Sequence, residues 1–286
     1  MDFALHFPGP PLDRHVESIT FYAGFAPSHD REKLLPDGAI QIIVDLTETP
    51  KRLFAGETSL IGVDFRKSWI SGMQQRWIVI EAQQQSSMMV IRFRPGGALA
   101  FVRHDADALT GAVHPLEDVL SSAVASSLRD RVLAAPTKPG RFAAAEAWLL
   151  EQAGGALQLN AAARHLAARL GRPGLRVRDA VEETGFTERH VLNLFRRWIG
   201  VSPKRYARIA RFQGLLATLA RPGEEDQQME APPLPAPDWA RIAAETGYAD
   251  QSHLNHEFLA FAGTTPGAYV AAYAGLTNYL PITLPR

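Results

Sequence analysis

Arginine and asparagine side chains at helical spacing in the last third of the chain could read the edges of DNA bases. Arg189, Asn193 and Arg196 are four and three residues apart, and a helix places such positions on one face. A guanidinium pairs with guanine in the major groove, and a carboxamide pairs with adenine. The solvated face of any amphipathic helix has the same spacing, so the surrounding pattern must decide between the two interpretations.

A second segment, further along the chain, carries polar side chains in a similar way. Its apolar positions Leu254, Phe258 and Phe261 share one side of a helix. The polar residues that we expect on the outer side are Gln251, Ser252, Asn255 and His256. His253 and Glu257 flank the apolar side, and we expect them to have structural roles.

The two segments belong to a repeated frame. The first copy contains Gly185-Phe186, Phe195, Gly200, Pro203 and Tyr206, and the second contains Gly247-Tyr248, Phe258, Gly263, Pro266 and Tyr269. A helix–turn–helix explains these landmarks, because Gly185 and Gly247 free the backbone where the first helix ends. Thr187 and Asp250 are suitable N-caps for the second helix. The repeat therefore predicts two helix–turn–helix units, over 177–206 and 239–269.

The distribution of charge supports a nucleic-acid partner, although the whole chain has a formal net charge of zero. Residues 176–221 contain ten lysine and arginine residues against four acidic ones, whereas the segment that follows is acidic. A basic block of this kind attracts phosphate groups. The remaining residues that we expect to contact DNA lie in this block: His190, Arg197, Lys204, Arg205 and Arg208. For the last three, a solvated helix face is the alternative.

The segment from Arg176 to Tyr269 resembles the DNA-binding domain of the AraC/XylS family of bacterial transcription regulators. The resemblance is carried by Asp250-Gln251-Ser252-His253-Leu254, Phe258, Gly263-Thr264-Thr265-Pro266 and Tyr269, with Ile199-Gly200-Val201-Ser202-Pro203-Lys204 and Tyr206 as the first-copy counterpart. It implies two recognition helices that enter adjacent segments of the major groove. It also implies a connecting helix over 203–220, whose basic side chains meet phosphates.

The second copy departs from the family at two positions where the family commonly has a basic residue. This chain has His256 and Leu259 there, so the second recognition helix carries no fixed positive charge. We therefore expect the first unit to supply most of the electrostatic affinity. The second would tune specificity or serve as a packing partner.

The complete pattern predicts an α+β fold with a β-rich, barrel-like N-terminal domain over 1–153 and an all-α domain over 156–275. Period-two alternation and turn motifs predict strands over 39–46, 77–82 and 88–94. Apolar residues at helical spacing predict helices over 116–132, 142–152 and 156–170. The stretch 222–237 is rich in proline and acidic residues, which predicts a disordered linker between the two units.

The N-terminal domain also resembles a known one. Leu34-Leu35-Pro36-Asp37-Gly38, Arg92-Phe93-Arg94-Pro95-Gly96-Gly97-Ala98 and Leu116-Glu117-Asp118 are similar to an uncharacterised domain that often precedes AraC-type DNA-binding domains. In the wider family this part is an effector or dimerisation module. An effector site here would use Arg92 and Arg94 for an anion, beside Trp69 and Trp77. A solvent-facing strand explains the arginines without a ligand, and an ordinary core explains the tryptophans.

Other chemistries find little support in the sequence. The chain has no cysteine, which excludes disulfides and cysteine-based metal sites. His253 and His256 do not have the spacing of zinc-binding helices. We expect no metal, no cofactor and no catalytic residue, because a nucleophile elbow, a phosphate loop and an acid–base pair are missing. An enzyme in the β-rich domain, and a regulator that acts mainly through protein contacts, are the alternatives.

The bulk composition is that of an ordinary soluble protein, with 46% hydrophobic and 21% charged residues. The N-terminus has no signal-peptide pattern, and no apolar stretch is long enough to span a bilayer. We expect a cytoplasmic protein that joins the nucleoid when it binds double-stranded promoter or operator DNA. A small-molecule effector, a second copy of the chain and RNA polymerase are the further partners that the resemblance implies.

Overall fold

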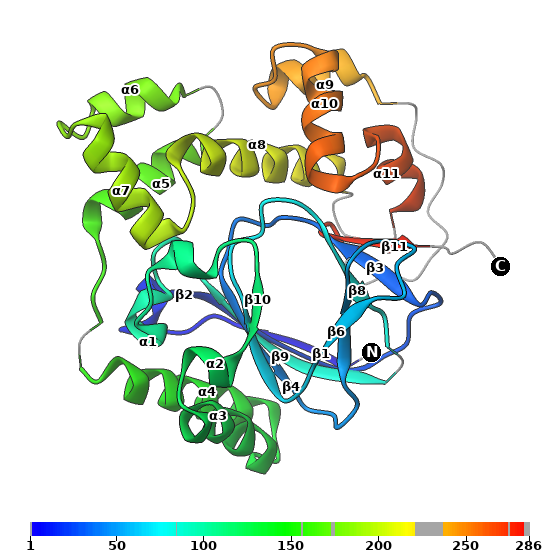
Figure 1. Ribbon diagram of the computed structural model, residues 1–286, viewed down its shortest axis with the longest axis vertical. Helices are drawn as coiled ribbons and strands as arrows, with labels where there is room; N and C mark the ends of the chain where they lie inside the picture. Colours follow the sequence, from blue (N-terminus) through cyan, green and yellow to red (C-terminus); the bar gives the residue numbers. More distant parts are fainter. Residues whose placement is uncertain are drawn as a thin grey trace.

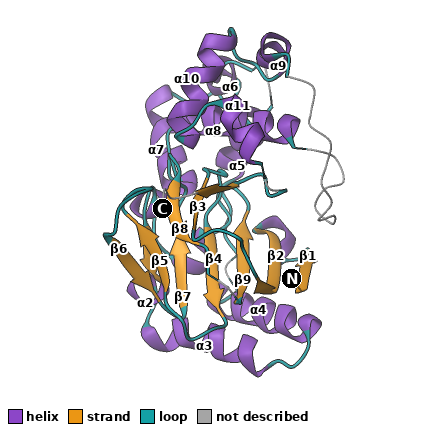
Figure 2. Cartoon of the chain, turned by 90° about the vertical axis from the view of Figure 1, so that its right-hand side faces the viewer, coloured by secondary structure: helices purple, strands orange, loops and turns teal. Residues whose placement is uncertain are grey.

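The computed structural model describes residues 2–83, 85–155, 157–172, 175–220, 237–273 and 275–282. A β-rich part and a helical part lie against each other, as the lower and upper halves of the molecule in Figures 1 and 2. The chain therefore has the α+β architecture that its sequence predicts, with strands and trailing helices first and an all-helical block afterwards.

The described strands form two antiparallel sheets around a common interior (Figure 1). The six-stranded sheet has the order β1 (Asp2–His6), β2 (Val16–Phe25), β9 (Ser86–Phe93), β4 (Gln41–Asp45), β7 (Ser68–Ser71) and β10 (Val113–Pro115). The five-stranded sheet has the order β11 (Tyr279–Ile282), β3 (Arg31–Leu34), β8 (Ile78–Glu81), β5 (Lys51–Phe54) and β6 (Gly62–Phe65). Strands β4, β8 and β9 confirm the three predicted strands.

Two long helices, α3 (Ser122–Ala134) and α4 (Lys138–Ala153), pack with the six-stranded sheet into one apolar core. Trp148 of α4 is fully buried there, together with Ile42 and Ile91 of the sheet. The helix predicted over 142–152 lies within α4. The single helix predicted over 116–132 is wrong, because α2 (Leu116–Val119) stops and Ser121 caps the start of α3. A serine hydroxyl that accepts from the backbone favours a new helix start over propagation.

Short elements connect the sheets to these helices. They are η1 (Leu12–Arg14), α1 (Leu99–Val102) and η2 (Ala106–Leu109). The turn of η1 and the segment around η2 face the helical part of the molecule.

The helical part consists of α5 (Ala161–Leu170), α6 (Val177–Glu182), α7 (Glu188–Ile199), α8 (Pro203–Leu219), α9 (Trp239–Glu245), α10 (Gln251–Ala262) and α11 (Pro266–Ala272). Helix α5 begins later than predicted, because Asn160 is extended and caps it. Of the predicted linker 222–237, only Pro237 lies within the described residues. In the described part of the chain, no helix is both long and apolar enough to cross a membrane.

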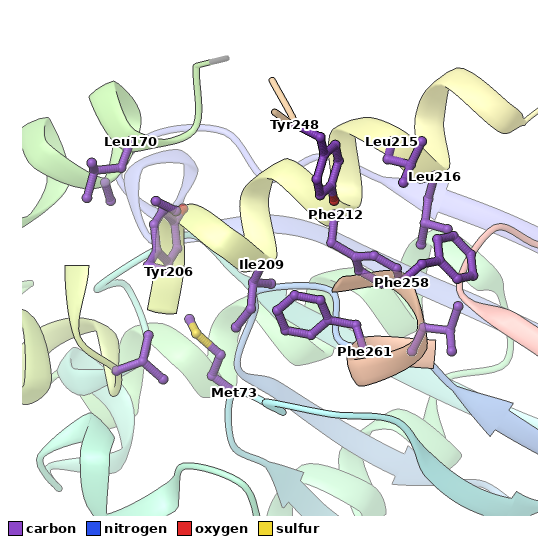
Figure 3. Packing of buried hydrophobic residues seen from close by; sticks show 14 of the residues in the cluster. Met73, Leu170, Tyr206, Ile209, Phe212, Leu215, Leu216, Tyr248, Phe258 and Phe261 are labelled. Atoms are coloured by element: carbon purple, nitrogen blue, oxygen red, sulfur yellow. The ribbon is translucent and has the colours of Figure 1, made fainter. Parts of the chain in front are cut away.

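Helix α8 runs through the centre of the helical part and organises its core. Figure 3 shows Phe212 of α8 packed against Phe258 and Phe261 of α10, with ring centroids 5.3 and 5.1 Å apart. Met73 reaches this core from the β-rich part and lies near Ile209. The helical core is therefore continuous with loops of the sheets.

The chain returns to the β-rich part after α11. Strand β11 pairs antiparallel with β3, with Tyr279 opposite Leu34 and Ile282 opposite Arg31. Leu280 is 5% exposed and belongs to the helical core. One strand thus completes the five-stranded sheet and contacts the helical domain, in a stretch for which the sequence predicts no element.

Candidate nucleic-acid interface

The first helix–turn–helix unit consists of α6 and α7. Gly185 between them has a φ of +71°, a conformation that glycine adopts without strain. The hydroxyl of Thr187 accepts a hydrogen bond from the His190 amide and caps α7, as predicted. The inner face of α7 consists of the buried Val191, Phe195 and Ile199 with the partly buried Leu194 and Trp198. Burial of this face fixes the direction in which the outer face points.

The outer face of α7 exposes Arg189, Asn193 and Arg196. None of the three side chains has a hydrogen-bond or ion-pair partner among the residues that the structure describes. Aligned polar groups that are free to bond outward are what base recognition requires. Two other predicted residues of α7 have neighbours. The ring of His190 lies 4.6 Å from that of Phe186, and Arg197 Nε is 3.1 Å from Asp105 Oδ1.

The second unit, α9 and α10, repeats this local geometry. Gly247 has a φ of +80°, and the Asp250 carboxylate accepts a 2.8 Å hydrogen bond from the His253 amide. The inner face of α10 consists of the buried Leu254, Phe258, Phe261 and Ala262. The outer residues Gln251, Ser252, Asn255 and His256 are all exposed. Helix α10 contains no lysine or arginine, and Leu259 on its outside is 52% exposed.

The two residues that flank the inner face of α10 hold the second unit together. The Ala249 amide donates to His253 Nδ1 at 3.2 Å. Both carboxylate oxygens of Glu257 accept from the guanidinium of Arg208, at 2.6 to 3.0 Å. Hydrogen bonding to Glu257 raises the pKa of Arg208, so this contact favours the charged guanidinium. His253 and Glu257 therefore have the structural roles expected of them.

The connecting helix α8 carries the remaining predicted cations, and they differ in their availability. Lys204 is exposed. Arg205 donates a 2.5 Å hydrogen bond to the Gln75 carbonyl, and its guanidinium lies over the Phe261 ring. Burial, followed by the charge of Arg208, lowers the pKa of Arg205. Since Arg208 is paired with Glu257, Lys204 is the member of this set most open to a phosphate.

A basic cavity of about 640 Å³ opens where α7 meets α8. Arg196, Lys204, Arg205 and Arg208 contribute its positive charge, and Asp107 of η2 with Gln75 closes it from the β-rich side. The cavity joins the outer face of α7 to the connecting helix. Its positive charge suits the phosphate groups of a nucleic-acid backbone.

The β-rich part contacts the ends of both α7 and α10. The hydroxyl of Thr110 donates a 2.8 Å hydrogen bond to the carbonyl of Gly200, which ends α7. The amide of Trp77 donates a 3.0 Å hydrogen bond to the Phe261 carbonyl in the last turn of α10. Nζ of Lys33 donates to the carbonyl of Gly263 at 3.2 Å. Figure 1 shows α8 spanning the two units above these contacts.

The sequence did not predict that Asp105, Asp107 and Thr110 of the β-rich part lie beside α7 and the basic cavity. Thr110 and Gly200 are 90 positions apart in the chain. Local periodicity and turn chemistry carry no information about such a pair. Asp105 and Asp107 lie in the short segment around η2, and nothing in the sequence of that segment indicates that they would face α7.

The predicted effector residues already have neighbours within the protein. Arg92 is bonded to Glu17 and Asp37, and Arg94 Nε donates to the Asp13 carbonyl at 2.8 Å. Trp69 lies beside Phe65, with ring centroids 5.9 Å apart. Trp77 packs against the helical part, where a Cβ on Gly263 would lie 2.2 Å from its indole nitrogen. None of the four lines the basic cavity.

In the described ranges, no cluster of three histidine, aspartate or glutamate residues has an arrangement that could hold a metal ion.

Comparisons with known proteins relate the chain to others at low similarity. Residues 5–115 match a family model described as a domain of unknown function, DUF6597. No curated protein matches the sequence. A crystal structure of ToxT from Vibrio cholerae O395 is 13% identical, with a TM-score of 0.46, over 90% of this chain and 99% of that one.

Two other solved structures are similar at comparable identity. Wild-type ToxT from Vibrio cholerae strain SCE256, bound to an unsaturated fatty acid, is 12% identical, with a TM-score of 0.45, over 92% of this chain and 97% of that one. The AraC-like transcriptional activator CuxR is 12% identical, with a TM-score of 0.27, over 74% of this chain and 86% of that one. At these identities the similarity concerns the fold of the backbone alone.

Proposed function

We propose that this chain is a sequence-specific DNA-binding transcription regulator of the AraC/XylS type, in which α7 and α10 enter successive segments of the major groove. The observation that carries the proposal is the exposed row of Arg189, Asn193 and Arg196 on α7, whose side chains have no partner among the described residues. A capped N-terminus, a buried inner face and an anchored C-terminus hold this helix. Rigid presentation of a few polar side chains is how a recognition helix reads base edges.

The second unit supports the same function in a different way. Its caps and turn repeat those of the first unit, while its outer face is polar and has no fixed positive charge. We assign most of the affinity for phosphates to α7, Lys204 and the basic cavity. Helix α10 then contributes discrimination between base sequences, through Asn255 and its polar neighbours.

We further propose that the β-rich part regulates the helical part in response to a small molecule. Its loops hold the ends of both recognition helices, at Gly200 and at Phe261. A ligand that favours one arrangement of these loops would therefore act on both DNA-reading units. In this proposal the chain works in the cytoplasm by binding and not by catalysis, as a homodimer that addresses RNA polymerase at a promoter.

A regulator that acts mainly through protein contacts is the second candidate. It is favoured by two ion pairs within the candidate interface, Asp105 with Arg197 and Glu257 with Arg208, which leave these arginines less available to phosphate. In that case the exposed face of α10, with Leu259 on its outside, would meet a protein instead of DNA.

Binding of the full chain to the DNA upstream of its own operon separates the two candidates. Fluorescence anisotropy, measured over a range of salt concentrations, should show specific binding that weakens steeply with salt, because the basic block releases counterions. Arg189→Ala and Arg196→Ala should each weaken binding by about tenfold or more, as expected for a lost base contact. Arg66→Ala, at an exposed position of the β-rich part, is the matched control.

One outcome of this experiment would contradict base recognition by α7. If the two α7 variants bind DNA like Arg66→Ala, the row on α7 does not read bases, and the protein-contact regulator is favoured.

A further inference from the structure

His15 is a buried histidine whose ring nitrogens both lack a hydrogen bond of acceptable geometry. It follows η1, is 1% exposed, and stacks edge-on against Phe101. The backbone carbonyls of Pro11 and Gln158 lie near the ring and act on its protonation, but neither completes a well-formed bond. Buried polar atoms without a partner are rare in native proteins and call for an explanation.

His15 also lines a cavity of about 370 Å³ between the β-rich and helical parts. Arg14, beside His15, and Arg164 of α5 line the same cavity. In the described part of the chain, neither guanidinium has a carboxylate within ion-pair distance. Asp13 is the acidic residue that acts on the His15 ring, and its influence is smaller than that of Arg164. The cavity therefore has two uncompensated cations in its wall.

The start of α5 forms another part of the wall. Ala161, the first residue of this ten-residue helix, lines the cavity, and Asn160 caps the helix by accepting from the Ala163 amide. The first amides of a helix and its dipole favour a negatively charged group nearby. The helix start and the two arginines thus favour the same kind of ligand atom.

The remaining wall is apolar. It consists of Pro11, Leu157 and Leu159. A lining that is partly apolar, with a few converging polar groups, is typical of small-molecule sites, and the volume lies within the range of such sites. An inorganic ion would leave the apolar side of this cavity without a partner.

We propose that this cavity binds a compact organic oxyanion, a carboxylate or a phosphate ester with an apolar body. Arg14 and Arg164 hold the anionic group, the apolar body lies against Pro11, Leu157 and Leu159, and the His15 ring beside the cavity senses its occupancy. Guanidinium groups suit both oxyanions, because their donors match pairs of oxygen atoms.

The position of the cavity links it to regulation, and this step rests on the proposed function. Its ligand would bridge the η1 turn of the β-rich part and the start of α5. Helix α5 packs directly against α6, α7 and α8, so it contacts the whole first DNA-reading unit. A ligand that binds one arrangement of α5 more tightly than another shifts the arrangement of that unit.

The binding step is tested on the full chain with four probes: benzoate, phenyl phosphate, benzyl alcohol and inorganic phosphate. Calorimetry gives the affinities. Proton–carbon NMR of the nine histidine rings reports where the probes bind, with the His15 signal assigned by its loss in His15→Gln. Benzoate, phenyl phosphate or both should shift the His15 signal, and the stronger of the two identifies the oxyanion. Benzyl alcohol lacks the charge and inorganic phosphate lacks the apolar body, so both should bind more weakly.

Three substitutions complete this test. Arg14→Gln and Arg164→Gln should each weaken binding of the aromatic anion by about tenfold, as expected for one charge-assisted contact. Arg66→Gln should leave the affinity unchanged. The proposal is overturned if neither aromatic anion shifts the His15 signal at millimolar concentration, if benzyl alcohol binds as tightly as the anions, or if both cavity variants bind like wild type. The calorimetric comparison uses only the arginine variants, so it remains valid even if His15→Gln does not fold.

A DNA-binding measurement with and without the aromatic anion separates this site from the proposed function. If the anion binds but the chain does not bind DNA, the site stands and the proposed function falls. If DNA binding is specific but no anion binds, the proposed function stands and this site falls.

Discussion

The guanidinium of Arg208 and the carboxylate of Glu257 form a two-pronged contact that joins α8 to α10, with three donor–acceptor distances between 2.6 and 3.0 Å. Arg208 lies on α8, between the two helix–turn–helix units, and Glu257 lies on α10 of the second unit. The contact therefore sets how α10 is presented relative to the first unit. It also removes a cation from the set that could neutralise phosphates.

Replacing Glu257 by glutamine tests both consequences. Loss of the charged partner should lower the free energy of unfolding by about 1–2 kcal/mol, because the pair is only partly exposed. It should also free Arg208 and raise the affinity for non-specific DNA, which reduces the specificity ratio. Urea denaturation and anisotropy measure the two effects.

Glu182→Gln is the matched control for this prediction. Glu182 forms a surface pair with Arg178 on α6, at 2.8 Å. Its loss should change stability by less than about 0.5 kcal/mol. Equal effects of Glu182→Gln and Glu257→Gln would contradict a special role for the Arg208 contact.

Asp105→Asn should strengthen DNA binding without affecting stability. Asp105 competes with phosphate for Arg197, and the pair is well exposed, with side chains 64% and 55% accessible. The affinity for DNA at low salt should rise by roughly two- to fivefold, since one interface cation is released. Asp64→Asn, which breaks the exposed pair with Arg52 in the β-rich part, should leave DNA binding unchanged. A rise in both variants would point to net charge alone.

Gly200→Ala should be more damaging than the same change at Gly185. Gly200 has a φ of +99°, and a Cβ there would lie 2.4 Å from Thr110 Oγ1 and 3.0 Å from the Ala106 carbonyl. Gly185 has a φ of +71° with nothing within 4 Å. Backbone strain should cost about 1 kcal/mol at Gly185, and the added clash should bring the loss at Gly200 to about 2–4 kcal/mol.

Thermal denaturation of the two glycine variants checks this difference. Adding Thr110→Ala to Gly200→Ala should recover part of the loss, because it removes the nearer of the two clashing atoms. No recovery would mean that the helix end can move away from the β-rich part at little cost.

The two recognition helices should differ in their salt dependence. Arg189→Ala and Arg196→Ala should each weaken binding to the preferred sequence by about tenfold and also reduce the salt slope, because each removes a positive charge from the surface that meets DNA. Asn255→Ala and His256→Ala should instead relax the choice of sequence while leaving the slope near that of wild type. If the α10 variants lose as much affinity as the α7 variants, the assignment of affinity to α7 is wrong.

Acid should destabilise the chain through His15. Burial is the main cause that lowers the pKa of His15 below its ordinary value of 6.5, and the charge of Arg164 lowers it further. The backbone carbonyls of Gln158 and Pro11, and the charge of Asp13, raise the pKa but do not outweigh burial. The folded state then binds fewer protons than the unfolded state, so stability falls as the pH drops below about 6.5. In His15→Gln this component of the pH dependence should disappear, as measured by urea denaturation at several pH values.

The helix–turn–helix units were predictable because their determinants are local. Thr187 and Asp250 cap helices within three residues, and Gly185 and Gly247 adopt positive φ values beside them. Each of these signals acts within one turn of chain, so inspection of the sequence recovers them. The inner and outer faces of α7 and α10 follow from the same periodicity.

The contacts between the two parts were not predictable in this way. Trp77 looked like part of a ligand pocket or an ordinary core, and the structure places it against the end of α10. Arg92 looked like an anion ligand or a solvated side chain, and it is bonded to Glu17 and Asp37. These outcomes depend on which distant segments meet, and that information is not contained in spacing along one strand.

The pairing of β11 with β3 has a consequence for the order in which the molecule is made. On the ribosome, β3 emerges early, and its partner β11 emerges only after both helix–turn–helix units. Until then β3 presents an open edge, and such edges invite pairing with the wrong strand. The five-stranded sheet therefore cannot reach its final form until the helical part has been synthesised, so completion of the β-rich part waits for the segment that follows the helices.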